Sequence, residues 1–343
     1  LAHLRWLSES NDYVHDTIVI SADIDASETR YWNDGTGFNP IGGSSSGDSF
    51  NGMLDGQGHV IKNLYINRSG DYVGFIARSR DVVTSEIKNL GIENCDITTS
   101  GARAGAIVGD LDGKIINCYS TGRITANEYP GGIAGYMNNN GTVINCYANV
   151  EITVFNRRAG GLSSTNTIDS IAFSYSSGKV SGATDDVGGF IGRAGDATDV
   201  ERVRANYWDV DRSGYTTSSP DPSLVFATGL STADMMKQAS FVDWDFTNTW
   251  AIAEGKTSPF LKWQKIIVRN DFITEGTTSS SLGAGYVYNN STGGETIVEY
   301  GYVYGIDSLP WFEGANLSHG AKLSEVSGAS IAAGNGADIS GAT

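Results

Sequence analysis

The chain has 343 residues and a formal net charge of −16, with 44 glycines, 6 prolines and 3 cysteines. An acidic surface repels phosphate backbones, so nucleic acid is not an expected partner. No apolar run reaches the roughly 18 residues that a membrane-spanning helix needs, which predicts no membrane insertion in this segment. The cysteines are too few for a disulfide scaffold.

Residues 1–55 are predicted to form an N-terminal cap. Leu1, Leu4 and Leu7 lie at helical spacing, and an acidic segment follows them. A stack of strands with open ends exposes unpaired edges that recruit other chains. We therefore expect this segment to fold over the first coil of the repeat that follows.

Residues 56–214 carry the repeat. Three copies read RAGAIVGDLDGKIINCYSTGRITA, YPGGIAGYMNNNGTVINCYANVEITV and RAGGLSSTNTIDSIAFSYSSGKVSG. The matched tyrosines Tyr119, Tyr147, Tyr175 and Tyr207 follow one another at intervals of 28, 28 and 32 residues. A weaker match pairs IKNLYI at 61–66 with IKNLGI at 87–92, so the array is expected to start near residue 55.

Each period holds three strand-length apolar segments separated by Gly, Asn or Asp turns. Helical repeats are excluded, because each interior glycine would cost a helix about 1 kcal/mol relative to alanine. The pattern predicts an all-β fold, a right-handed parallel β-helix with three strands per coil. Equivalent residues of successive coils then stack about 4.8 Å apart.

In-register stacking places like side chains on one another. Asn117 and Asn145 are expected to form a side-chain ladder. Cys118 and Cys146 share a register, and a stacked pair of buried thiols is favoured over a disulfide.

Residues 215–265 are predicted to form a C-terminal cap. The stretch LSTADMMKQASF reads as one short helix with a capping box from Ser231 to Asp234. An aromatic cluster is expected to close the stack, made of Trp244, Phe246, Trp250, Phe260 and Trp263. In residues 266–343 the repeat is gone, and GAGYVYNN and ETIVEYGYVYG suggest a partial β-sandwich-like module or a linker.

The ordered motifs of residues 1–263 carry a family resemblance. They include WLSES, ISADIDAS, FNGMLDGQGHVIKNLYI, GGIAG, NCYSTG, GGFIG, NYWDVDRSG, ATGLSTADM and FVDWDF. The chain resembles GLUG-repeat bacterial secreted or cell-surface proteins, named for a Gly-Leu-any-Gly core. Two departures predict one looser coil: Gly161-Leu162-Ser163-Ser164 lacks the last core glycine, and Phe173-Ser174 replaces the Asn-Cys pair.

The resemblance implies a large extracellular protein, attached to the cell surface, in which such repeats are adhesin or stalk modules. The implied partner is a glycan or protein on a host or neighbouring cell, or another copy of the chain. GLUG repeats also occur beside the zinc protease domain of immunoglobulin-cleaving enzymes.

No catalytic residues are predicted. His3, His15, His59 and His319 are scattered and form no HExxH motif, so a zinc protease domain is absent from this sequence. A polysaccharide lyase or glycosidase needs carboxylates gathered on one face. The acids of the repeat instead fall in turns at differing phases and are expected to be solvated: Asp110, Asp112, Glu128, Glu151, Asp185 and Asp186.

Two binding sites remain candidates. Asp209, Asp211 and Ser213 imitate the start of a calcium loop, but Pro220 stands at its twelfth position, so a turn without bound Ca²⁺ is favoured. The tyrosines Tyr65, Tyr119, Tyr147, Tyr175 and Tyr207 would form a sugar-stacking strip if their column faced outward, although a structural ladder is favoured.

The leading hypothesis is a non-catalytic adhesin or stalk module. Three alternatives stay open: a carbohydrate-active β-helix enzyme, the repeat region of a secreted protease, and a subunit of an extracellular filament.

Overall fold

The computed structural model describes residues 1–10, 15–43, 48–80, 84–138, 140–166, 170–183, 185–194, 202–264, 267–271, 284–288 and 337–338. The chain divides into two compact units, Leu1–Leu261 and Lys262–Thr343. In the second unit the described strands form an antiparallel sheet of β25 (Ile267–Asp271), β26 (Ala284–Tyr288) and β27 (Ala337–Asp338).

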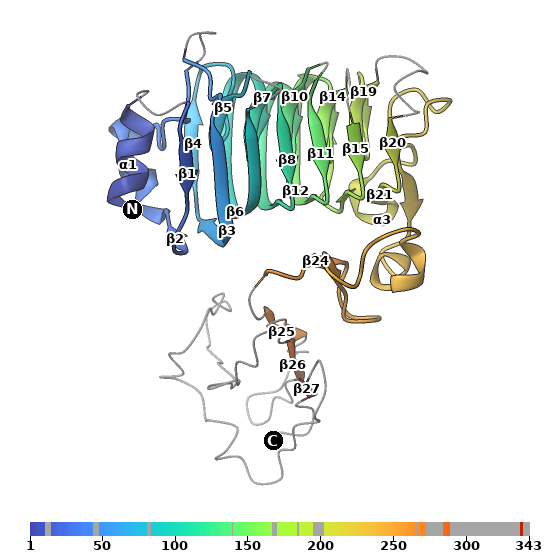
Figure 1. Cartoon of the computed structure of the whole chain (residues 1–343). Coiled ribbons are helices and arrows are strands. Elements are labelled where there is room, and N and C mark those ends of the chain that lie inside the picture. Colours follow the sequence, from blue (N-terminus) through green and yellow to red (C-terminus); the bar gives the residue numbers. More distant parts are fainter. Residues whose placement is uncertain are drawn as a thin grey trace, which may run out of the picture. The chain divides into compact units, whose positions relative to one another are not determined.

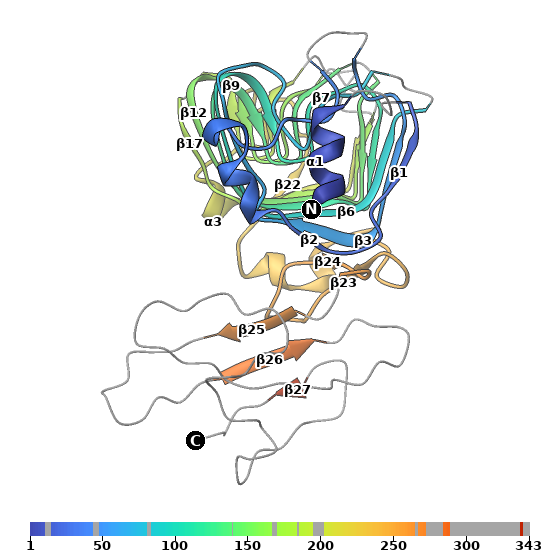
Figure 2. The same ribbon diagram turned by 90° about the vertical axis from the view of Figure 1, so that its left-hand side faces the viewer.

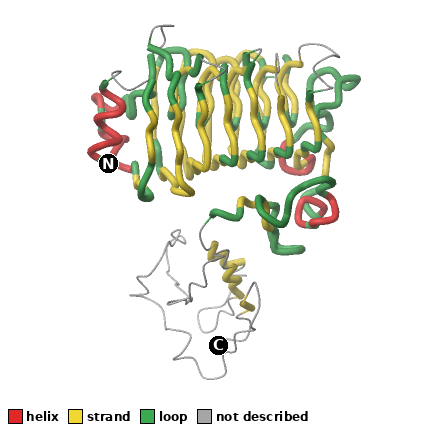
Figure 3. The backbone as a smooth tube through the Cα atoms, in the orientation of Figure 1, coloured by secondary structure: helices red, strands yellow, loops and turns green. Residues whose placement is uncertain are grey.

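The first unit is a β-solenoid of about 5 turns, built from stacked parallel strands (Figure 1). A central coil shows the plan: a long strand β9 (Tyr119–Gly131), a short strand β10 (Ala134–Met137) and a third strand β11 (Thr142–Ile144). Strands form the body of the unit and helices lie at its ends (Figure 3). The predicted all-β solenoid with three strands per coil is confirmed.

The same three positions recur along the stack. The long position is occupied by β3 (Met53–Lys62), β4 (Tyr65–Arg68), β6 (Glu86–Gly105), β9, β12 (Tyr147–Arg157), β13 (Ala159–Gly160), β16 (Tyr175–Ser176), β17 (Val180–Gly182), β18 (Val187–Gly188) and β21 (Tyr207–Asp209). A second sheet holds β5 (Ile76–Arg78), β7 (Val108–Leu111), β10, β14 (Ser163–Asn166) and β19 (Ile191–Ala194). The third position holds β8 (Lys114–Ile116), β11, β15 (Ser170–Ala172) and β20 (Val203–Arg204).

The register of the strands follows the tyrosine repeat. Tyr147 pairs with Tyr119 on one side and with Tyr175 on the other, and Tyr175 pairs with Tyr207. The weaker upstream match is wrong, because Ile87 pairs with Leu54 and not with residue 61. A register shift between Asp55 and His59 displaces the two similar segments relative to each other.

The N-terminal segment forms a coil as well as a cover. α1 (Ala2–Glu9) lies at the N-terminal end of the stack and buries Leu4 and Leu7, while Leu1 is exposed (Figure 2). β1 (Thr17–Val19) pairs in parallel with the start of β3, and β2 (Ile24–Asp25) pairs with its end. The short helices η1 (Ser27–Tyr31) and η2 (Asn33–Gly35) follow. Parallel stacking therefore begins upstream of the repeat that the sequence shows.

The C-terminal segment begins with α3 (Val210–Ser213) and β22 (Thr228–Leu230), which pairs with β21. The single helix expected from LSTADMMKQASF is wrong. Two 3₁₀ turns are found, η3 (Asp234–Met236) and η4 (Gln238–Ser240), because Lys237 between them is extended. The Ser231 hydroxyl still caps the first turn by accepting from the Asp234 amide. β23 (Trp250–Ala251) and β24 (Phe260–Leu261) then form an antiparallel pair.

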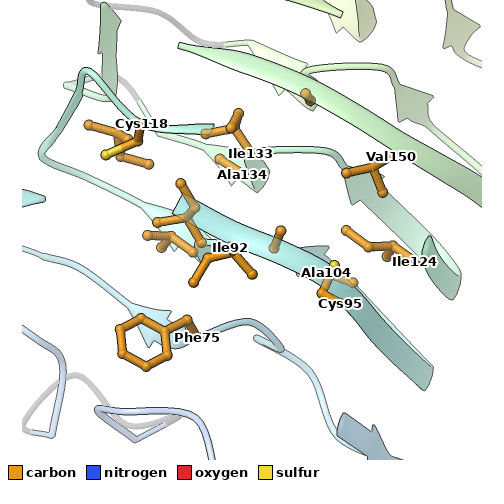
Figure 4. Packing of buried hydrophobic residues seen from close by; sticks show 14 of the residues in the cluster. Phe75, Ile92, Cys95, Ala104, Cys118, Ile124, Ile133, Ala134 and Val150 are labelled. Atoms are coloured by element: carbon orange, nitrogen blue, oxygen red, sulfur yellow. The ribbon is translucent and has the colours of Figure 1, made fainter. Parts of the chain in front are cut away.

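The core is one continuous column of stacked side chains (Figure 4). Ile124 pairs with Ile97 and Ile152 in the neighbouring coils, and all are buried. Burying one such side chain contributes about 1.5–3 kcal/mol. Because side chains alternate between the two faces of a strand, this inward row fixes which residues form the outward rows.

The corner between the long strand and the second sheet requires glycine. A Cβ at Gly131 would lie 2.2 Å from the Ala134 carbonyl oxygen and 2.6 Å from Ser163 Cα, both of them backbone atoms. Ser164, which replaces the last core glycine in its coil, is buried and donates its hydroxyl to the Gly135 carbonyl. The Gly-rich core of the repeat is therefore a packing requirement.

Candidate binding face

The tyrosine column is stacked but covered. The rings of Tyr147 and Tyr119 lie 5.0 Å apart at 10°, and those of Tyr147 and Tyr175 lie 5.0 Å apart at 3°. Trp250 of the C-terminal segment lies 6.3 Å from Tyr147 and 6.2 Å from Tyr175. Tyr147 is only 7% exposed. A sugar has no access to these ring faces, which favours the structural ladder.

The ends of the column explain its extent. Tyr207 shares the register, but its ring packs edge-on against Phe241 at 4.9 Å and its hydroxyl accepts the Val242 amide. At the other end Gly91 lies beside Tyr119, and a Cβ at Gly91 would come within 2.5 Å of that ring. Tyr65 pairs with Asp96 and does not belong to the column.

An asparagine ladder lines the corner that precedes the long strand. Asn145 donates its amide to Asn117 at 3.1 Å, and Asn117 donates to Asn89 at 3.3 Å. Asn117 and Asn145 both adopt a left-handed backbone with φ of 53°, which asparagine tolerates better than most residues. Phe173 occupies the same corner with φ of 51° and ends the ladder.

The cysteines next to this ladder are free and buried. The Cys118 amide donates to the Cys146 sulfur at 3.4 Å, and the Cys146 amide donates to the Ser174 hydroxyl at 3.1 Å. Each side chain in this row thus satisfies a backbone N–H of the preceding coil, and Ser174 continues the row. Burial raises the pKa of the Cys118 thiol, and it raises that of Cys95 to about 12.

The calcium candidates form a helix cap. The buried Asp209 carboxylate accepts the amides of Asp211 and Arg212, each at 3.0 Å. The Thr232 hydroxyl contacts both oxygens of Asp209, at 2.9 and 2.8 Å. Ser213 bonds to Tyr215. Within the described ranges no three acidic, histidine or cysteine residues are placed to hold a metal ion.

Asp110 is not solvated, contrary to the sequence expectation. Its side chain is fully buried, with Arg78, Arg80 and Arg103 at 3.5, 3.5 and 3.3 Å. Asn138 also donates to it. Desolvation raises the pKa of Asp110, while the nearby arginines oppose that shift. Sequence reasoning missed this cluster because its members come from different coils and become neighbours only through the register.

The other acids of the repeat behave more nearly as turn residues. Asp112, Glu128 and Asp186 are partly buried, and each accepts a side-chain hydrogen bond from the following coil or corner. Glu151 and Asp185 are exposed.

The outward rows of the long strands form an accessible polar surface, here called the threonine face. One row contains Asn67, Thr98, Thr125, Thr153 and Ser181, each in register with the next. The parallel row contains Tyr65, Asp96, Arg123 and Glu151. The sequence analysis missed this face, although the shared spacing of the three threonines was a usable signal.

Two hollows open on the threonine face. The first has a volume of about 550 Å³ and is lined by Ser27, Arg30, Asn63, Asn94, Cys95, Asp96, Gly122, Arg123 and Glu151. The second, about 460 Å³, is lined by Thr36, Asn67, Arg68, Ser69, Thr98, Thr99, Ser100, Asn127 and Phe155. Phe155 is 68% exposed.

Ion pairs fix the side chains of the first hollow. Arg123 binds Asp96 through Nε and Nη2, both at 2.8 Å, and Arg30 binds the same carboxylate at 3.0 Å. The Arg30 guanidinium also lies 4.2 Å from the Tyr65 ring centre. The hydrogen bonds from Arg123 lower the pKa of Asp96. The hollow therefore presents a fixed carboxylate beside guanidinium donors.

Comparison with known proteins gives a partial relative and a fold. No family model matches the chain. It is 37% identical over 139 residues to halomucin of Haloquadratum walsbyi, which covers 39% of this chain and 2% of halomucin. The chain thus spans a small fraction of that relative.

The crystal structure of a putative immunoglobulin A1 protease from Bacteroides ovatus is similar, with a TM-score of 0.53. The identity is 20%, and the match covers 76% of this chain and 90% of the other. This likeness shows the fold alone. None of the helices in the described ranges is long and apolar enough to cross a bilayer.

Proposed function

We propose that this chain is a non-catalytic adhesin module of a large secreted or cell-surface protein. The observation that carries the proposal is the threonine face, an accessible polar surface held by a continuous core and in-register strands. The similarity to part of halomucin supports a repeat segment within a much longer chain. The GLUG resemblance points the same way and stays a prediction.

The first hollow is suited to binding and not to cleavage. A glycosidase needs one carboxylic acid with a raised pKa to protonate the leaving group. Asp96 and Glu151 both line the hollow, but Arg123 lowers the pKa of Asp96 and keeps it ionised. This pair therefore lacks the general acid that a carbohydrate-active enzyme would use.

Presentation of a face fits the dimensions better than spacing does. A stack of about 5 coils at about 4.8 Å each is roughly 24 Å long, which is short for a stalk. A stalk built from this fold would need further copies in the same protein.

The purified chain tests the proposal directly. It is incubated with intact cells and with insoluble polysaccharides, and both bound protein and released sugar are measured. We expect retention without released product. Product that disappears in a Glu151→Gln variant would establish an enzyme instead, and polymers in negative-stain images would establish a filament subunit.

A further inference from the structure

The two hollows of the threonine face lie along the same strands. Residues 96, 123 and 151 line the first, and residues 100, 127 and 155 line the second, four positions further along each strand. At about 3.3 Å per residue, the hollows are roughly 13 Å apart. One extended ligand can therefore contact both.

The lining chemistry of the first hollow is polar and balanced in charge. Its two guanidinium groups, Arg30 and Arg123, face two carboxylates, Asp96 and Glu151. The whole chain carries −16, so an anionic ligand would be repelled at long range. The hollow thus favours a ligand that has hydrogen-bonding groups but no net charge.

The second hollow adds an aromatic platform. Phe155 is 68% exposed and lies among hydroxyl and amide side chains that include Thr98, Ser100 and Asn127. An exposed aromatic ring covers the C–H face of a sugar, and neighbouring hydroxyls and amides bond to its O–H groups. A partner protein would instead favour a larger apolar centre.

We propose that the threonine face binds an uncharged oligosaccharide along the direction of the strands, across both hollows. Phe155 stacks on one sugar, and Thr125, Asn127 and Arg123 bond to hydroxyl groups between the hollows. β-Branched threonines and an ion-paired arginine lose little freedom on binding, so the surface is preorganised. The inference rests on the proposed binding function and names its ligand class.

The test uses the full chain and defined soluble probes. Cellohexaose, xylohexaose and mannohexaose serve as neutral probes, and hexagalacturonate serves as the anionic one, with binding measured by titration calorimetry. We expect a neutral probe to bind. Phe155→Ala should weaken it about tenfold and Asn127→Ala several-fold, as for central contact residues. Val225→Ala, which also truncates an exposed apolar side chain (61%), should stay within twofold.

Because Phe155 is exposed, circular dichroism and melting of its variant should match the parent chain. If only hexagalacturonate binds, if no neutral probe binds, or if Phe155→Ala binds as well as the parent, the inference is overturned. The chain could then still be retained on cells without product, and the proposed function would stand. Release of sugar product would instead remove the proposed function itself.

Discussion

Truncating Tyr147 tests the covered aromatic column. Its ring is stacked at 5.0 Å on both sides and touches the C-terminal segment through Trp250. Replacing a buried large aromatic side chain with alanine costs about 3–5 kcal/mol, and each lost aromatic pair contributes about 0.5–1.5 kcal/mol of that range. We therefore expect Tyr147→Ala to lower the free energy of unfolding by about 4 kcal/mol.

Urea unfolding followed by far-ultraviolet circular dichroism measures this loss. Tyr31→Ala is the matched control, because Tyr31 is 82% exposed and its truncation should change stability by less than about 0.5 kcal/mol. Combining Tyr147→Ala with Trp250→Ala should reveal a coupling of about 1 kcal/mol. A loss below about 1 kcal/mol in Tyr147→Ala, or strict additivity of the pair, would refute the packing of this column under the C-terminal segment.

Three further changes have definite signs. Phe173→Asn should stabilise the chain by about 1 kcal/mol, because asparagine suits the left-handed corner and can donate to Asn145; thermal melting measures this. Asp110→Asn should lower the free energy of unfolding by about 3 kcal/mol in urea titrations, because it leaves three arginines without their carboxylate. The buried thiols should not react with a thiol reagent until the chain is denatured. Since burial raises the pKa of Cys95 from 9.0 to about 12, the unfolded thiol ionises first. Stability from its burial should be present below about pH 9 and be lost as the pH rises toward 12.

Each of these has a clear contrary result. A lower melting temperature for Phe173→Asn would mean that contact with Arg204, 5.0 Å from the Phe173 ring, outweighs backbone strain. If Asp110→Asn cost no more than the exposed control Asp185→Asn, the arginine cluster would not need its carboxylate. Rapid labelling of native thiols would show that the cysteine row is open to solvent.

The repeat was predictable because selection of like residues at a fixed interval reports the stacking itself. Tyr119, Tyr147 and Tyr175 pair as their spacing predicted. The upstream register was not predictable, because the shift after Asp55 leaves similar segments in the sequence but not opposite each other. Local similarity cannot detect such an insertion.

The site was less predictable than the fold. The aromatic residues of the C-terminal segment were expected to close the stack, but a sequence does not show that Trp250 lies against the side of two coils. The burial of Asp110 and the row of Thr98, Thr125 and Thr153 depend likewise on contacts between coils. Such sites become visible only once the register is known.

The central claim is that successive coils stack in register to form the threonine face. Nitroxide labels on Thr98→Cys and Ser181→Cys, read by electron paramagnetic resonance, measure it directly. Three register steps separate these residues, so their Cα atoms should lie about 14 Å apart, with a narrow distance distribution. A broad distribution, or a distance that exceeds this value by more than the reach of the two label linkers, would contradict the stacking.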